Sequence, residues 1–136
     1  MAGKVLDSHA LVAFFRDDAG AEAVESLLVA ASKKDTPLLL SDVSYAEVKC
    51  AIVRKDGPEA WNEASRVLQG LPIEVCSTSR ALADAAGTIK AHHEVSLADA
   101  FAAALAKEKK AELVTGDQDF KELEKEIKIH WLPATS

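Results

Sequence analysis

Four acidic residues of this chain adjoin apolar segments, where a soluble protein rarely places a charge. They are Asp7, Glu47, Asp99 and Asp117, and only Glu47 has a lysine or arginine within two positions, Lys49. A carboxylate in such surroundings needs a compensating partner, because dehydrating an unpaired charge is expensive. If the fold gathers the four acids, the natural partner is a divalent cation, since hard cations prefer oxygen ligands.

Each acid also has a purely structural explanation. The segments Ser96–Asp99 and Ser44–Glu47 fit the capping-box pattern that begins many helices, Asp7 would cap a helix that starts at the next residue, and Asp117 would fix a turn. Neither Glu47 nor Asp99 has a cation three or four residues further on. Capping therefore stays open for each acid singly, but it accounts less well for all four together.

Length and composition limit the class of protein. The chain has 136 residues, and we expect it to form a single domain over 1–136. Hydrophobic residues make up 49% of the sequence but aromatic residues only 5%, a composition that favours closely packed helices. The chain has no apolar run near the ~20 residues of a membrane-spanning helix, and its beginning lacks the apolar region of a signal peptide. We therefore expect a cytoplasmic protein without membrane association. Cys50 and Cys76 lie in apolar patterns and are predicted to be reduced core thiols.

The net charge of −6 bears on possible partners. Proteins that bind nucleic acid tightly and without sequence preference carry a strong positive footprint, which this chain lacks. An enzyme that touches a phosphodiester through bound metal ions remains compatible with the charge, because divalent ions reverse the local sign of an acidic site.

Short apolar runs alternate with segments of helical periodicity along the whole chain. This alternation predicts parallel strands joined by helices, in a three-layer α/β/α sandwich. Strands are expected at 4–7, 38–40, 73–76, 112–115 and 127–132, and helices at 9–15, 21–31, 43–53, 58–68, 79–91, 97–110 and 119–126.

The expected strands place two of the acids. Asp7 ends the first strand and Asp117 follows the fourth, and chemistry in parallel sheets collects at the carboxyl ends of strands. The two acids face one crevice if those strands are neighbours. Glu47 and Asp99 come from helices that would lean over the same edge.

Other combinations of residues give less support for a catalytic or binding site. Ser8 has no histidine at a suggestive spacing, no cysteine–histidine cluster supports zinc, and no glycine-rich phosphate loop is present. His9 follows Asp7 by two residues and borders the expected site, although a structural role explains it as well. Trp61 and Trp131 are predicted to belong to the core.

Four sequence blocks, in order, resemble the PIN-domain nucleases, and most of all the VapC toxins of prokaryotic toxin–antitoxin pairs. The blocks are Val5–Leu11, Ser44–Val48, Ser96–Ala103 and Leu113–Phe120. The resemblance covers nearly the whole chain and implies a PIN-like fold with a five-stranded parallel sheet in the order 3-2-1-4-5.

The resemblance also implies a function: Mg²⁺- or Mn²⁺-dependent cleavage of RNA by one or two ions, a homodimer, and a cognate antitoxin that covers the site. Carried over residue by residue, it implies that the metal ligands are Asp7, Glu47, Asp99 and Asp117, that Asp119 is an accessory acid, and that the hydroxyls of Ser8 and Thr115 orient ligands or waters. Within this set, Asp7 and Asp117 are expected to hold the first ion and Asp99 to be shared.

The sequence-based hypothesis is thus a divalent-metal-dependent endoribonuclease that hydrolyses phosphodiester bonds. An aspartyl-nucleophile phosphatase needs a second aspartate two residues after the first, where His9 stands. A phosphoacceptor receiver domain needs a paired acid near the first strand and a lysine after the last, and neither is found. The alternative from another class is a non-catalytic PIN-like module that acts as a dimeric interaction domain.

Overall fold

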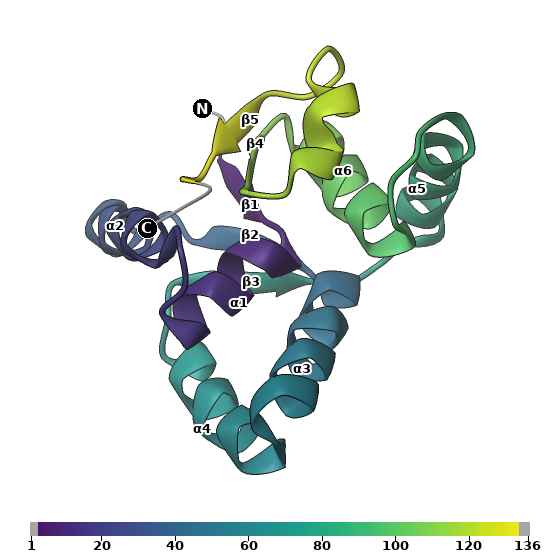
Figure 1. Cartoon of the computed structure of the whole chain (residues 1–136). Helices are drawn as coiled ribbons and strands as arrows, with labels where there is room; N and C mark the ends of the chain where they lie inside the picture. Colours follow the sequence, from purple (N-terminus) through teal and green to yellow (C-terminus); the bar gives the residue numbers. More distant parts are fainter. Residues whose placement is uncertain (1–2, 134–136) are drawn as a thin grey trace.

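The computed structural model describes residues 3–133, which form one five-stranded sheet with helices on both faces (Figure 1). The strands are β1 Lys4–Leu6, β2 Leu38–Ser41, β3 Ile73–Cys76, β4 Glu112–Thr115 and β5 Ile129–Trp131. Every neighbouring pair is parallel, and the order is β3-β2-β1-β4-β5. The expected three-layer architecture and the expected strand order are both confirmed.

Six α-helices and one 3₁₀ helix connect the strands in the described part of the chain. They are α1 Ser8–Arg16, α2 Ala21–Lys34, α3 Asp42–Asp56, α4 Pro58–Gln69, α5 Arg80–His92, α6 Leu97–Lys109 and η1 Gln118–Leu123. The expected helix 119–126 is this short 3₁₀ helix, and the expected strand 127–132 is reduced to β5. No helix of residues 3–133 has the length and apolar character needed to cross a membrane.

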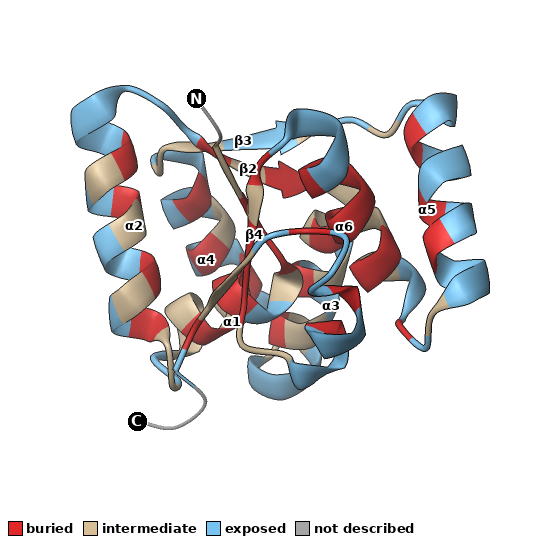
Figure 2. Cartoon of the chain, turned by 90° about the horizontal axis from the view of Figure 1, so that it is seen from above, coloured by how far each residue is buried: buried red, intermediate tan, exposed pale blue. Residues whose placement is uncertain are grey.

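The central strands separate two hydrophobic clusters. Val5 packs with α5, α6 and η1, whereas the next residue, Leu6, packs with α1, α2, α3 and α4. Leu113 and Val114 of β4 divide between the two clusters in the same way, because successive side chains of a strand point to opposite faces. β1 and β4 are therefore buried on both sides, as the middle strands of a parallel sheet are, and Figure 2 shows this buried centre between exposed outer helix faces.

Helix α6 is buried around most of its circumference. Its residues 102–106 are each at most 2% exposed, and four of the five are alanines. Such small side chains allow α6 to lie close to α5, α3 and the sheet at once. Ser96 caps the start of this helix by accepting a hydrogen bond from the Asp99 backbone N–H at 3.1 Å. The packing holds the first turn of α6, and Asp99 with it, at the carboxyl edge of the sheet.

The prediction of a core thiol is wrong for Cys50 in α3. α3 buries Ser44, Val48 and Ile52, whereas Cys50 is exposed. The reason is that α3 packs against α1 and α6 as well as α4, so its partners select a face that its apolar periodicity alone does not identify. Cys76 is half-buried at the end of the edge strand β3 and packs against the core cluster on the α5–α6 side of the sheet.

The two tryptophans differ in their surroundings. Trp61 is buried between α4 and its neighbours, as predicted, with an edge-to-face contact to Tyr45. Trp131 is half-buried on the edge strand β5, and its indole N–H donates a hydrogen bond to Glu124 at 2.9 Å. Trp131 therefore packs against the core, as predicted, but is not fully buried, because its indole keeps its donor at the surface.

Candidate metal centre

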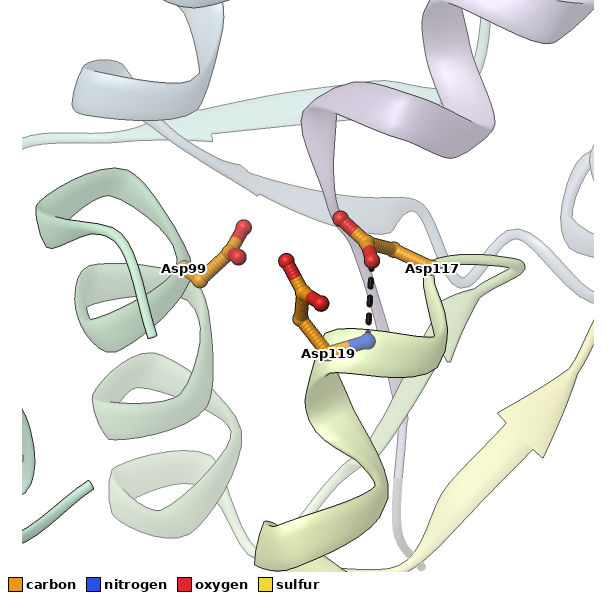
Figure 3. A group of neighbouring side chains, drawn as sticks. All are labelled: Asp99, Asp117 and Asp119. Carbon is orange, nitrogen blue, oxygen red and sulfur yellow. Dashed lines mark hydrogen bonds between the residues drawn. The ribbon is translucent and has the colours of Figure 1, made fainter. Parts of the chain in front are cut away.

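Three carboxylates converge at the carboxyl edge of the sheet. One oxygen each of Asp99, Asp117 and Asp119 can be chosen so that all three lie within 4.8 Å of one another (Figure 3). Asp99 comes from the first turn of α6, and the other two come from the segment that begins η1. Asp117 caps η1 by accepting a hydrogen bond from the Asp119 backbone N–H at 2.9 Å. This bond leaves the Asp119 carboxylate free to turn toward Asp99.

Asp7 lies deeper than these three and is only 1% exposed. It follows the last residue of β1 and caps α1, accepting a hydrogen bond from the Ala10 backbone N–H at 2.8 Å. Its other carboxylate oxygen accepts from the Thr115 hydroxyl at 2.5 Å, and that hydroxyl in turn accepts from the Asp117 backbone N–H at 2.9 Å. Thr115 thus links the carboxyl ends of β1 and β4 and sets the position of Asp117 relative to Asp7.

Glu47 reaches the same edge from α3. It is half-buried, and its carboxylate accepts a hydrogen bond from the Ser8 hydroxyl at the start of α1. The hydroxyl of Ser8 therefore contacts an acid of the expected set, as the hydroxyl of Thr115 does. Asp7 and Glu47 lie outside the group of three with the shortest separations, whereas Asp119, expected only as an accessory acid, belongs to it.

The buried acids of this edge bind protons more tightly than ordinary carboxyls. Burial raises the pKa of Asp7 to about 7, even though hydrogen bonds from Thr115 and Ala10 lower it, and the charges of Asp99 and Asp117 add to the increase. Burial, followed by the charge of Asp117, raises the pKa of Asp99 to about 6. Without a cation, this edge therefore disfavours the ionised form of the two acids.

No lysine, arginine or histidine of residues 3–133 forms an ion pair with Asp7, Glu47, Asp99, Asp117 or Asp119. The nearby donor atoms are carboxylate and hydroxyl oxygens, which suit Mg²⁺ or Mn²⁺, whereas zinc sites use mainly cysteine and histidine. The chemistry of this donor set therefore fits a hard divalent cation.

Part of the capping interpretation is also confirmed. Asp7 caps α1, and Asp117 caps η1, so both acids serve a helix start and face the acidic cluster at once. The capping box proposed for Ser44–Glu47 is wrong, because the cap of α3 is Ser41, three residues before Ser44, and the helix begins at Asp42. Glu47 consequently lies in the second turn of α3, where its carboxylate has no capping role.

His9 is a feature of the site that the sequence only hinted at. A Cβ atom placed on Gly116 would lie 2.8 Å from Cε1 of His9, so the exposed imidazole packs directly on the backbone between Thr115 and Asp117. The available signal was a lone glycine immediately before an acid, together with a histidine two residues after another acid.

The strand order and the acidic edge define an α/β protein of PIN-like architecture, and comparisons with known proteins agree. The family model of the PIN domain matches residues 4–126, and the chain therefore belongs to the PIN domain family. A search of curated proteins finds no match.

Solved structures show the same fold at low sequence identity. VapBC2 from Rickettsia felis, bound to a DNA fragment from its promoter, matches with a TM-score of 0.73 at 15% identity, over 95% of this chain and 98% of the other. VapC20 from Mycobacterium tuberculosis is described as a toxin that cleaves the sarcin–ricin loop. It matches with a TM-score of 0.71 at 18% sequence identity, over 88% of this chain and 94% of the other. DNA-bound VapBC from Salmonella typhimurium matches with a TM-score of 0.69 at 17% sequence identity, over 96% of this chain and 98% of the other.

Proposed function

We propose that this PIN domain is a divalent-metal-dependent endoribonuclease that hydrolyses phosphodiester bonds of RNA. The observation that carries the proposal is the group formed by Asp99, Asp117 and Asp119, which has the buried Asp7 beneath it and no cationic side chain paired with it in the described chain. Together with Glu47 these are five acids without a cationic partner, and they are costly to hold together. A bound cation removes that cost while creating a site for phosphate oxygens.

Each residue then has a definable task. A bound Mg²⁺ or Mn²⁺ would activate a water molecule and stabilise the leaving oxygen of the cleaved bond. Asp99, Asp117 and Asp119 would hold the cation, and Asp7 would support them through Thr115. Glu47, hydrogen-bonded to Ser8, would assist in holding the cation, directly or through a water. No nucleophilic side chain is needed, because phosphoryl transfer depends mainly on positioning and charge neutralisation.

The biological role in this proposal is that of a VapC-type toxin. The toxin–antitoxin complexes and the RNA-cleaving toxin among the structural neighbours support it at the level of fold. We accordingly propose a cytoplasmic homodimer, built from the single domain 1–136, that is held inactive by a cognate antitoxin. The net charge of −6 implies that its affinity for RNA depends on the bound metal.

The direct test is cleavage of RNA by the purified protein. We expect internal cleavage of a structured RNA in Mg²⁺ or Mn²⁺, complete loss of cleavage in EDTA, and recovery when Mn²⁺ is restored in excess of the chelator. Single-stranded DNA of the same sequence serves as the comparison substrate. An RNA fragmentation pattern that persists unchanged in EDTA would identify a contaminating metal-independent nuclease and would give the proposal no support.

Metal binding can be tested separately from cleavage by thermal melting. Mn²⁺ at a hundredfold excess over its dissociation constant is expected to stabilise the protein by about 2.7 kcal/mol, because it binds only the folded state. The Asp119→Asn variant is expected to lose most of this stabilisation, whereas Asp84→Asn, on the exposed face of α5, is expected to retain it. A melting temperature indifferent to Mn²⁺ and Mg²⁺ would favour the non-catalytic interaction module.

A further inference from the structure

A cavity of about 360 Å³ opens between α1 and α3, directly beside the acidic cluster. Ser8, Glu47 and Gly116 form its boundary with the cluster, and the α1 residues Val12 and Ala13 contribute apolar lining. Its volume falls within the range of small-ligand pockets in proteins, ~300–1,000 Å³. Glu47 belongs to the acidic edge and Gly116 immediately precedes Asp117, so the cavity adjoins the acids.

His9 lines the cavity beside Gly116, the residue that precedes Asp117. The side chain is exposed, and Cε1 and Nδ1 of its ring approach the backbone of Gly116 so closely that an added Cβ would lie 2.8 and 3.3 Å from these two atoms. The glycine thus allows an aromatic ring to rest between the metal-binding segment and the cavity. An exposed aromatic ring of this kind offers a surface on which a nucleobase can stack.

The other end of the cavity carries a positive charge. Lys55 is the only lysine or arginine among the lining residues found in the described chain. It lies eight residues after Glu47 on the same helix, α3, and therefore about 12 Å further along the helix axis. The lysine side chain is long and flexible, so its ammonium group can reach back along the helix and contact the phosphate that follows the cleaved one.

The charges within the cavity favour a base over a phosphate. Asp18 and Glu47 line it and offer only acceptors when ionised, so they repel a phosphate but can accept hydrogen bonds from the N–H groups of a base. The apolar side chains of Val12 and Ala51 suit a flat, weakly hydrated ring. Asp18 already pairs with Arg16 and Glu47 already accepts from Ser8, so each has only its remaining acceptor positions for a base. A nucleobase inside, with its phosphates outside at Lys55 and at the metal, uses these positions.

We propose that this cavity binds the nucleobase next to the cleaved phosphate, with His9 as its stacking partner and Lys55 as the contact to the following phosphate. This inference rests on the proposed ribonuclease function and adds a subsite to it. It makes His9 a residue that positions the substrate, outside the group that binds the metal.

Binding of nucleoside 5′-monophosphates in EDTA, followed by NMR of the ¹⁵N-labelled protein, tests the subsite without any cleavage. GMP and AMP are expected to shift the amides of Val12, Ala51 and Gly116, whereas ribose 5-phosphate, which lacks a base, leaves them in place. His9→Ala is expected to weaken nucleotide binding about tenfold, an effect typical of losing one base–aromatic contact. His9→Phe is expected to retain binding, since it keeps a ring.

His92→Ala is the matched control, because His92 is an exposed histidine at the end of α5 and outside the cavity lining. Gly116→Ala provides a second route, since its Cβ displaces the His9 ring and is expected to weaken binding while His9 itself is retained. The subsite is wrong if ribose 5-phosphate causes the same shifts as GMP, or if His9→Ala binds nucleotides as well as His92→Ala does.

The outcome is separable from that of the proposed function. Metal-dependent RNA cleavage without base-dependent shifts would remove the subsite and leave the nuclease. Base-dependent shifts that require His9, in a protein that fails to cleave RNA in any divalent metal, would support the subsite and remove the nuclease.

Discussion

The Asp99→Asn variant is expected to lose metal-dependent RNA cleavage by about a thousandfold or more, while remaining folded. Each 1.36 kcal/mol of lost transition-state stabilisation lowers a rate tenfold, and a cation that is lost or misplaced removes several kcal/mol. Asparagine keeps the shape of the side chain, and the hydrogen bond from the Asp99 backbone N–H to Ser96 is unaffected. The initial rate of cleavage of a labelled RNA in Mn²⁺, with the circular dichroism spectrum as the check on folding, measures the effect.

Asp84→Asn is the matched control for this measurement. It makes the same chemical change on the exposed surface of α5, outside the group of acids, and is expected to leave the rate unchanged. If Asp99→Asn retains cleavage within tenfold of the unmodified protein, and that cleavage still disappears in EDTA, then Asp99 has no part in the mechanism. The cation would in that case have to be held by Asp117 and the remaining acids.

The convergence of Asp7 and Asp117 illustrates what the sequence alone could predict. Alternating strand-like and helical segments indicate parallel strands, and the carboxyl ends of parallel strands meet at one edge. The two acids lie at that edge because β1 and β4 are neighbours, which only the resemblance to the PIN family had indicated. Their positions were therefore predictable, whereas the depth of Asp7 was not, because its burial depends on α1 packing over the end of β1.

The parts that the sequence did not reveal depend on tertiary contacts. The inner face of α3 is selected by α1, α4 and α6 together, so an apolar stripe that included Cys50 was misleading. Asp119 joins the closest group of acids because a single 3₁₀ turn, fixed by Asp117, directs it toward α6. A short turn of this kind carries no periodicity that distinguishes it from the start of an α-helix.

The free energy of unfolding of the metal-free protein is expected to decrease as the pH rises from about 4 to about 7, and the Asp7→Asn variant is expected to lose most of this dependence. The pKa of Asp7 is raised from 3.8 to about 7 in the folded protein. Between these two values the folded state keeps a proton that the unfolded chain has already released. Stability is therefore greatest below the lower value, is lost as the pH rises toward the upper one, and is constant beyond it.

The size of this effect follows from the same two values. A shift of this extent corresponds to at most about 4 kcal/mol, because each unit is worth 1.36 kcal/mol. At pH 8 in EDTA, Asp7→Asn is expected to be more stable than the unmodified protein by about 2–4 kcal/mol, a difference that shrinks as the pH falls toward 4. Urea denaturation at a series of pH values, with Asp84→Asn as the control, measures both curves.

Excess Mn²⁺ is expected to reduce or reverse this difference. The ionised Asp7 then lies beneath a bound cation, whose charge offsets the cost of burying the carboxylate, while the asparagine variant gains less from the metal. A variant that is less stable than the unmodified protein at pH 8 without metal would show that hydrogen bonds from Thr115 and Ala10 outweigh the cost of burying this charge. Asp7 would then be a structural cap with no electrostatic strain for a cation to relieve.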